Sequence, residues 1–213
     1  ALDRPIPIGA LQRFAIDACR DAGRPFVVAG PLHPGRVAVV GAGPAGLACA
    51  AELRRLGVAV TVFETRDQAG GLCAYGIVPW RHAREMTAHE VAEIRRAGAE
   101  FRLGTRIGEV GAGAGSGTAN ITPTTLTTAF DAVFLGLGLG RSRRLGIPGE
   151  GLDGVFDALT VLEPIVTGEG VHPALGRRVG VIGGGSTAMD AAAAAVHLGA
   201  DDVTIFYRRS EAE

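Results

Sequence analysis

The chain has 213 residues, of which 47% are hydrophobic and 20% are charged, and its formal net charge is −1. This length accommodates one large domain or two small ones, and the balanced charge without a basic face argues against a nucleic-acid-binding protein. Uncharged stretches are far shorter than the roughly 20 apolar residues of a membrane span, and the first residues lack the apolar core of a signal peptide. We therefore expect a cytoplasmic protein with no membrane span.

The first predicted elements form a complete β-α-β unit. Apolar residues at helical spacing predict a helix over residues 8–22, which a Pro/Gly-rich linker at 30–35 joins to a β-branched strand at 36–40. A glycine-rich turn follows, then an Ala/Leu-rich helix to about Leu56 and a second strand at 59–63. This is the strand-helix-strand context that a dinucleotide-binding turn requires.

The middle of the chain is less regular. A charged helix is expected at 86–97, followed by a strand near Phe101 and another strand at 132–137, whose residues 131–135 are apolar enough for a central position in a parallel sheet. The run of Gly, Ala and Ser at 111–117 predicts a flexible surface loop.

A second β-α-β unit ends the chain. After a connection with one helix near 157–165, the sequence predicts a strand at 179–182, a helix at 187–198 and a strand at 203–207. The predicted fold class is therefore α/β: a Rossmann-like domain with a doubly wound parallel sheet, followed by the start of a second Rossmann-like domain. Because two strands make an incomplete sheet and the first residue is Ala, we expect a piece of a longer protein. The predicted domains are 1–35, 36–177 and 178–213.

The first glycine turn has the pattern that binds a pyrophosphate at a helix N-terminus. Gly41 permits the tight turn, Gly43 permits close approach of the phosphates, and Gly46 permits close packing of helix on strand. Glu64 follows the second strand, where a carboxylate accepts hydrogen bonds from ribose hydroxyls. The alternative interpretation of Glu64 is a surface carboxylate.

The second turn repeats the pattern with Gly183 and Gly185, but its second strand leads to Arg208 and Arg209. Paired guanidinium groups suit a ribose that carries an extra phosphate, so this unit predicts an NADP-type dinucleotide. The alternative is a solvated arginine pair in a loop. Asp190, on the helix after this turn, is expected to help fix the helix start or to pack near the nicotinamide domain.

With these motifs, the chain resembles the FAD- and NADPH-binding region shared by the glutamate synthase small subunit and dihydropyrimidine dehydrogenase, within the pyridine nucleotide-disulfide oxidoreductases. The resemblance rests on the order of four segments: residues 5–14, 37–47, 70–72 and 207–209. It implies FAD contacts at Gly41, Ala42, Gly43, Pro44, Ala45, Gly46, Glu64, Gly70, Gly71, Leu72, Arg81, Ile107 and Gly138. It implies NADPH contacts at Gly184, Gly185, Ser186, Thr187, Arg208 and Arg209.

The implied function is that of a flavin-dependent oxidoreductase module, which takes hydride from NADPH onto FAD and passes electrons to a partner domain or subunit. The resemblance also implies iron–sulfur (4Fe-4S) clusters on the parent protein, bound by cysteines ahead of this segment and not by this chain. Because the cofactors carry the chemistry, no side chain is named as a catalytic acid or base.

Two other interpretations compete with this function. A disulfide reductase needs a cysteine pair just after Gly70 and Gly71, and only Cys73 is there, with Val78 where a partner five residues on would stand. A non-catalytic FAD-binding module without NADPH activity remains the alternative. The final acceptor stays open among glutamate formation, pyrimidine reduction and an unrelated iron–sulfur partner.

Overall fold

The structure is a computed structural model that describes residues 5–108, 119–140 and 142–209. The chain divides into two compact units, Ala1–Asp67 with His89–Gly136, and Gln68–Ala88 with Leu137–Glu213. The predicted loop at 111–117 lies outside the described residues.

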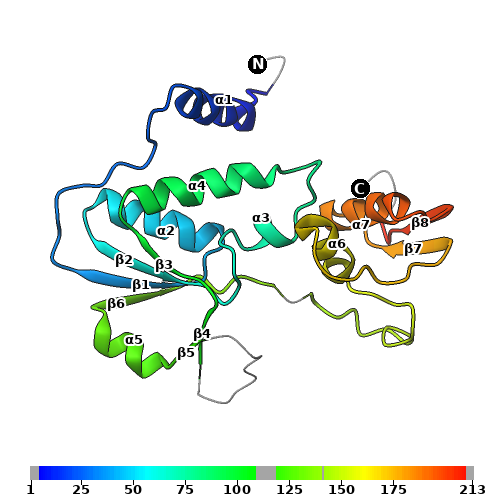
Figure 1. Cartoon of the computed structure of the whole chain (residues 1–213). Helices are drawn as coiled ribbons and strands as arrows, with labels where there is room; N and C mark the ends of the chain where they lie inside the picture. The colour runs from blue at the N-terminus through cyan, green and yellow to red at the C-terminus, as the bar shows by residue number, and fades with distance from the viewer. Residues whose placement is uncertain (1–4, 109–118, 141, 210–213) are drawn as a thin grey trace. The chain divides into compact units, whose positions relative to one another are not determined.

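The first unit is built on a parallel sheet. Its helices and strands are α1 (Ile8–Asp21), β1 (Arg36–Val40), α2 (Pro44–Arg55), β2 (Ala59–Phe63), β3 (Glu100–Arg102), β4 (Thr105–Ile107), β5 (Ala119–Ile121), α5 (Pro123–Ala129) and β6 (Ala132–Leu135). Four of these strands form one parallel sheet in the order β3-β2-β1-β6, and β4 pairs with β5 in a second parallel sheet (Figure 1). In the larger sheet Val39 lies opposite Val62 on one side and Phe134 on the other.

The β-branched strands are buried because helices cover the sheet. Figure 1 shows α2 and α5 on opposite sides of it, and Val39 and Val62 are fully buried. On one face, Phe63 packs with Leu126 of α5 and meets the ring of Phe130 edge-on, with the ring centroids 5.8 Å apart. This packing fixes the carboxyl ends of β1 and β2, where the first glycine turn and Glu64 lie.

The second unit contains the other β-α-β element. Its elements are α3 (Leu72–Tyr75), α6 (Ala158–Thr167), β7 (Arg178–Ile182), α7 (Ser186–His197) and β8 (Asp202–Phe206), and α4 (Arg84–Arg96) contains the boundary between the units. β7 and β8 pair in parallel, with Ile182 opposite Phe206. The core joins Val78, Leu162 and Val166 to Ala194 of α7, so α7 is held by the helix and loop that precede it in the chain.

The predicted α/β class with parallel, Rossmann-like units is confirmed, and each predicted helix and strand has its counterpart in the structure. Four short elements, α3, β4, β5 and α5, were not predicted. The sequence signal for α5 was present: Thr122 caps the helix by accepting a hydrogen bond from the Thr125 N–H, and Pro123 occupies its first position. Its threonines have low helix propensity and concealed that signal.

The prediction of a central strand at 131–135 is wrong for the described part of the chain. β6 lies at the edge of the described sheet, with β1 as its neighbour, and Leu135 is 65% exposed. An apolar run predicts a strand, but it does not determine the strand order.

No helix within the described ranges is both long and apolar enough to cross a lipid bilayer.

Candidate functional site

The first glycine turn, residues 41–46, connects β1 to α2. Gly41 has φ of +100°, which only glycine adopts without strain, and its N–H donates to the Phe63 carbonyl at 2.7 Å. Gly43 is the N-cap of α2, and Pro44 begins the helix, where its missing N–H costs nothing. A Cβ on Gly46 would lie 1.9 Å from the Gly41 carbonyl oxygen. The structure thus contains the tight turn at Gly41 and the close packing at Gly46, whereas their contact with a cofactor stays a prediction. The N–H groups of Ala45 and Gly46 lie in the first helical turn and have no intrahelical acceptors.

Glu64 is held beside this turn. Its two carboxylate oxygens accept hydrogen bonds from backbone N–H groups, one from Ala42 at 2.8 Å and the other from Arg66 at 3.0 Å. The Glu64 backbone is fixed as well, because its N–H donates to Arg102 and its carbonyl accepts from Thr105. The structure thus places the carboxylate against the glycine turn, at the place expected for ribose recognition. Ile107, on β4, packs against the core that contains Phe63.

The second turn, residues 183–188, has a similar backbone geometry. Gly183 has φ of +133°, and its N–H donates to the Phe206 carbonyl at 2.9 Å. Gly185 is the N-cap of α7 with φ −85° and ψ 176°, close to the −77° and −179° of Gly43. Ser186 and Thr187 form the first turn of α7. Both turns therefore present a helix N-terminus in the same way.

β8 ends at Phe206, and Tyr207, Arg208 and Arg209 are the next three residues. Both arginine side chains are exposed. The strand pairing places this end of β8 beside the end of β7, from which the second turn starts. The arginine pair and the second glycine turn are thus at the same edge of the β7–β8 sheet.

The remaining predicted FAD contacts lie on other segments of the second unit. Gly70 and Gly71 have φ of +131° and +56° and lead into α3, which begins at the partly exposed Leu72. A Cβ on Gly70 would lie 2.5 Å from Thr87 Cγ2, so a larger residue does not fit there. Gly138 has φ of +68°, with open space where a side chain would be. Their contact with FAD remains a prediction.

Arg81 forms an ion pair that the sequence did not predict. Its Nε donates to Oδ1 of Asp190 on α7. The Asp190 side chain is only 10% exposed, whereas that of Arg81 is 44% exposed. Of the two alternatives for Asp190, fixing the helix start is wrong, because the N-cap of α7 is Gly185 and has no side-chain cap. Packing near the nicotinamide domain stays a prediction. Asp190 instead ties α7 to the segment that follows α3.

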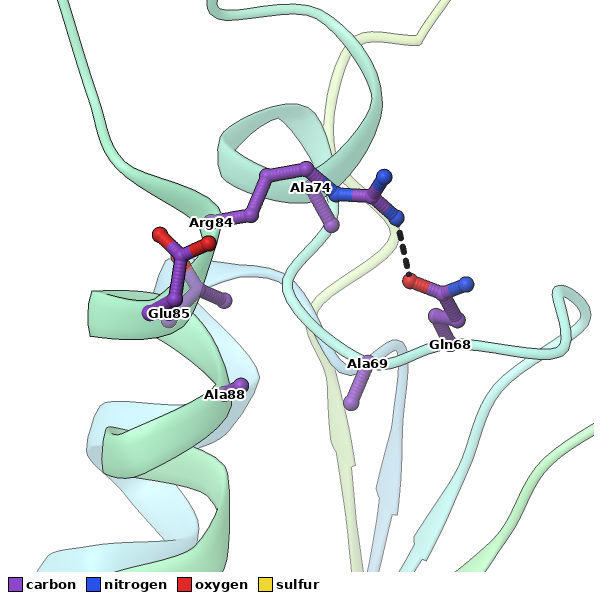
Figure 2. A pocket seen from close by; sticks show the side chains of 7 residues that line it. Gln68, Ala69, Ala74, Arg84, Glu85 and Ala88 are labelled. Atoms are coloured by element: carbon purple, nitrogen blue, oxygen red, sulfur yellow. Dashed lines mark hydrogen bonds between the residues drawn. The ribbon is translucent and has the colours of Figure 1, made fainter. Parts of the chain in front are cut away.

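A small pocket lies next to the double glycine (Figure 2). It has a volume of about 290 Å³ and is lined by Gln68, Ala69, Ala74, Arg84, Glu85, Thr87 and Ala88. Arg84 donates to Gln68 Oε1 at 2.9 Å, the bond drawn in Figure 2, and to the Thr167 carbonyl at 3.0 Å. None of the predicted cofactor contacts lines this pocket, and the Arg84 guanidinium is occupied by protein acceptors.

Cys19, Cys49 and Cys73, all within described segments, form no disulfide. Burial raises the pKa of the Cys49 thiol, which lies on α2. Among the described residues, no group of three or more His, Cys, Asp or Glu side chains is arranged to hold a metal ion.

Comparison with curated proteins finds relatives over the whole chain. It is 35% identical to the NADP(+)-dependent formate dehydrogenase subunit beta of Moorella thermoacetica, over 100% of this chain and 32% of that protein. It is 36% identical to the glutamate synthase [NADPH] small chain of Escherichia coli K12, over 97% of this chain and 44% of that protein. The chain thus spans less than half the length of these two relatives.

Among solved structures, Mycobacterium tuberculosis FprA in complex with NADPH is similar, with a TM-score of 0.62 and 25% sequence identity. The similarity covers 74% of this chain and 35% of that one. The sequence profile of the pyridine nucleotide-disulphide oxidoreductase family matches residues 35–213. Together with the two glycine turns, this match shows that the chain belongs to the pyridine nucleotide-disulphide oxidoreductase family.

Proposed function

We propose that this chain is the FAD- and NADPH-binding module of an oxidoreductase, with FAD at the first glycine turn and NADPH at the second. One observation carries the proposal. The two turns share the strand-to-turn hydrogen bond and the extended N-cap glycine, yet Glu64 follows one strand and an arginine pair follows the other. A chain with one such turn would bind one dinucleotide, whereas this chain has two sites of different charge.

The first turn fits FAD in its backbone and in its charge. Gly41 to Gly46 leave the α2 N-terminus open to a pyrophosphate, and Glu64 supplies carboxylate oxygens for ribose hydroxyls. We extend the proposed FAD contacts to Ile107, Gly70, Gly71, Leu72, Arg81 and Gly138 on the basis of the family resemblance.

The second turn fits NADPH because its cations suit an extra phosphate. Gly184, Gly185, Ser186 and Thr187 would hold the pyrophosphate at the α7 N-terminus, and Arg208 and Arg209 would bind the 2′-phosphate. The names of the relatives and the NADPH complex of FprA support this choice of nucleotide.

When bound, the two cofactors would supply the redox chemistry, which is the transfer of a hydride, with its two electrons, from NADPH to FAD. The chain contributes binding, orientation and exclusion of water. We therefore propose no catalytic acid or base.

We further propose that the electrons leave for an iron–sulfur or flavin domain or subunit, with 4Fe-4S clusters on the parent protein. Two relatives are named as beta subunits, the formate dehydrogenase subunit and the NADPH-Fe(3+) oxidoreductase subunit of Geobacter sulfurreducens. One name pairs NADP(+) with formate and the other pairs NADPH with Fe(3+), so the redox partner of this chain is not assigned. In this proposal residues 36–177 are the first FAD-binding segment, residues 178–213 belong to the NADPH domain, and residues 1–35 precede both.

The double variant R208A/R209A tests the choice of NADPH. A hydrogen bond to a charged group contributes about 1.5 to 3 kcal/mol, so losing the phosphate contacts should weaken NADPH at least about tenfold. NADH, which has no 2′-phosphate, should bind nearly as before. The measurement is the Kd of each nucleotide for the FAD-loaded protein.

The matched control is R143A/R144A, which removes the same charge from an exposed arginine pair on the connection before α6. Its NADPH to NADH ratio should equal that of the wild type. Equal weakening of both nucleotides by R208A/R209A would remove the reason for assigning NADP to the second turn.

A further inference from the structure

The two turns differ at one pair of equivalent positions. Gly41 donates to the carbonyl of Phe63, and Gly183 donates to the carbonyl of Phe206. The next residue of each strand end is therefore equivalent, which matches Glu64 with Tyr207. By the same bond, Ala42 in the first turn is equivalent to Gly184 in the second.

These equivalent residues make different contacts with their turns. In the first turn the Ala42 N–H donates to the Glu64 carboxylate at 2.8 Å. In the second, the Tyr207 ring lies against Gly184: a Cβ on Gly184 would be 2.5 Å from Cδ2 and 2.6 Å from Cε2 of that ring. An aromatic ring thus takes the place of a carboxylate, and only a glycine at 184 leaves room for it.

We propose that Tyr207 determines the nucleotide specificity of the second turn. Its ring favours a dinucleotide with a 2′-phosphate over one with a plain ribose. This inference rests on the proposed binding of NADPH at that turn. Arg208 and Arg209 supply the cations that bind the 2′-phosphate. Tyr207 determines how well a dinucleotide with a plain ribose competes with one that carries this phosphate.

Two physical effects follow from the ring. First, the ring stands at the position that a carboxylate occupies in the first turn. The second turn therefore has no carboxylate there to accept a hydrogen bond from a 2′-hydroxyl or to repel a 2′-phosphate. Second, its packing on Gly184 fixes the backbone immediately before Arg208, so that the arginine pair stays beside the turn. Tyr207 is 50% exposed, so the ring contacts the turn while part of it faces solvent.

Neighbouring glycines show that this contact is local. A Cβ on Gly185 would meet no atom within 4 Å, which leaves the approach to the α7 N-terminus open. Gly180, on β7, is packed instead by the ring of Phe206, because a Cβ on Gly180 would lie 3.0 Å from Cε2 of that ring. Phe206 therefore provides a matched aromatic residue that packs on a glycine away from the turn.

The experiment compares the Kd values of NADPH and NADH for the FAD-loaded wild type and three variants. Y207L removes the ring and should lower the preference for NADPH by roughly tenfold, in the range that pocket substitutions produce. Y207F keeps the ring and should retain the wild-type ratio. F206L, the control, should also retain it.

A fourth variant, Y207E, restores the carboxylate of the first turn and should weaken NADPH more than Y207L does, while NADH is kept or improved. The inference is overturned if Y207L and F206L leave the same ratio, or if Y207E weakens both nucleotides equally. If the variants give such results while the wild type still prefers NADPH, the proposed function stands and only the inference about Tyr207 fails. A wild type that binds neither nucleotide overturns both, and FAD content reports the folding of each variant.

Discussion

At the scale of single residues, the Glu64 carboxylate combines an observed task with a proposed one, and both use the same oxygens. In the structure it binds the N–H groups of Ala42 and Arg66 and so fixes the turn to the end of β2. Each carboxylate oxygen has further lone pairs for ribose hydroxyls. The residue that we propose to bind the cofactor therefore also organises the turn that receives it.

Replacing Glu64 by Gln should weaken both tasks. One amide oxygen can still accept, but the NH₂ group faces a backbone N–H, which leaves that donor without an acceptor at a cost of about 1 to 3 kcal/mol. We expect a lower melting temperature without cofactor and FAD affinity reduced by at least about tenfold. Thermal unfolding and FAD titration measure the two effects.

Glu52→Gln is the control, because Glu52 lies on α2 with a 65% exposed side chain and only a long ion pair to Arg55 at 3.9 Å. It should change neither measurement. An E64Q protein with wild-type stability and FAD affinity would contradict both tasks.

The sequence was sufficient to place the first glycine turn and Glu64 in one unit, because the pattern that identifies them lies within a short stretch of the chain. Gly41, Gly46 and Glu64 belong to one β-α-β unit, and their spacing follows from the lengths of its elements. Tyr207 precedes the arginine pair in the sequence, but its packing on Gly184 depends on the register in which β7 and β8 pair, and the sequence alone does not give this register.

At the scale of elements, α7 is positioned by the Arg81–Asp190 ion pair. These residues are 109 positions apart, so no local spacing could have predicted the pair. Asp190 is buried on α7, one turn beyond the N-cap that receives the proposed NADPH. The ion pair therefore stabilises the element that presents the second turn.

Arg81→Ala should destabilise the second unit, because it leaves a buried carboxylate without its cation. Since Arg81 is itself 44% exposed, we expect less than the cost of breaking a fully buried pair, about 1 to 3 kcal/mol. Urea unfolding followed by the fluorescence of Trp80, the single tryptophan and the neighbour of Arg81, measures it.

Arg177→Ala is the matched control, because the Arg177–Asp201 pair is 87% and 54% exposed. Exposed ion pairs contribute little, so the urea midpoint should hardly move. If both variants shift the midpoint equally, the burial of Asp190 has no special importance.

α4 is attached to the segment before β1 through Glu93. Its carboxylate accepts from the Phe26 N–H at 3.1 Å and pairs with Arg96, whose guanidinium also donates to the Val27 carbonyl at 2.9 Å. The hydrogen bond from Arg96 is the main cause that lowers the pKa of Glu93, and the Phe26 N–H acts in the same direction.

This shift predicts a pH dependence with a definite sign. A carboxylate with a lowered pKa in the folded state stabilises the protein above its ordinary pKa of about 4.3, and the stabilisation is lost as pH falls through the lowered value. Glu93→Gln should therefore lower the melting temperature at neutral pH. It should have a smaller effect at an acidic pH below the lowered pKa of Glu93, where this side chain is protonated in both states.

Glu90→Gln, on the exposed side of the same helix, should have little effect at either pH. A melting-temperature difference for E93Q that is the same at both pH values would contradict an ionic origin of the attachment.

At the scale of the whole molecule, the sequence predicted the kind of fold better than its details. The two β-α-β units, with their glycine turns, were predicted in order. The strand order at β6 and the short elements α3, β4 and β5 were not, because they depend on packing between distant segments. The helix α5 was missed for a local reason, since its threonines have low helix propensity. The predicted domain boundaries at 35/36 and 177/178 remain predictions. The compact units of the structure divide at other residues.

The central claim is that one chain holds a flavin and the nucleotide that reduces it. The most direct measurement is anaerobic addition of NADPH to the FAD-loaded protein, with NADH as comparison, while the visible absorbance of oxidised flavin is followed. We predict loss of this absorbance with NADPH, and a slower or smaller loss with NADH. A flavin spectrum that responds to neither nucleotide would contradict the account and favour a module in which FAD is bound without NADPH chemistry.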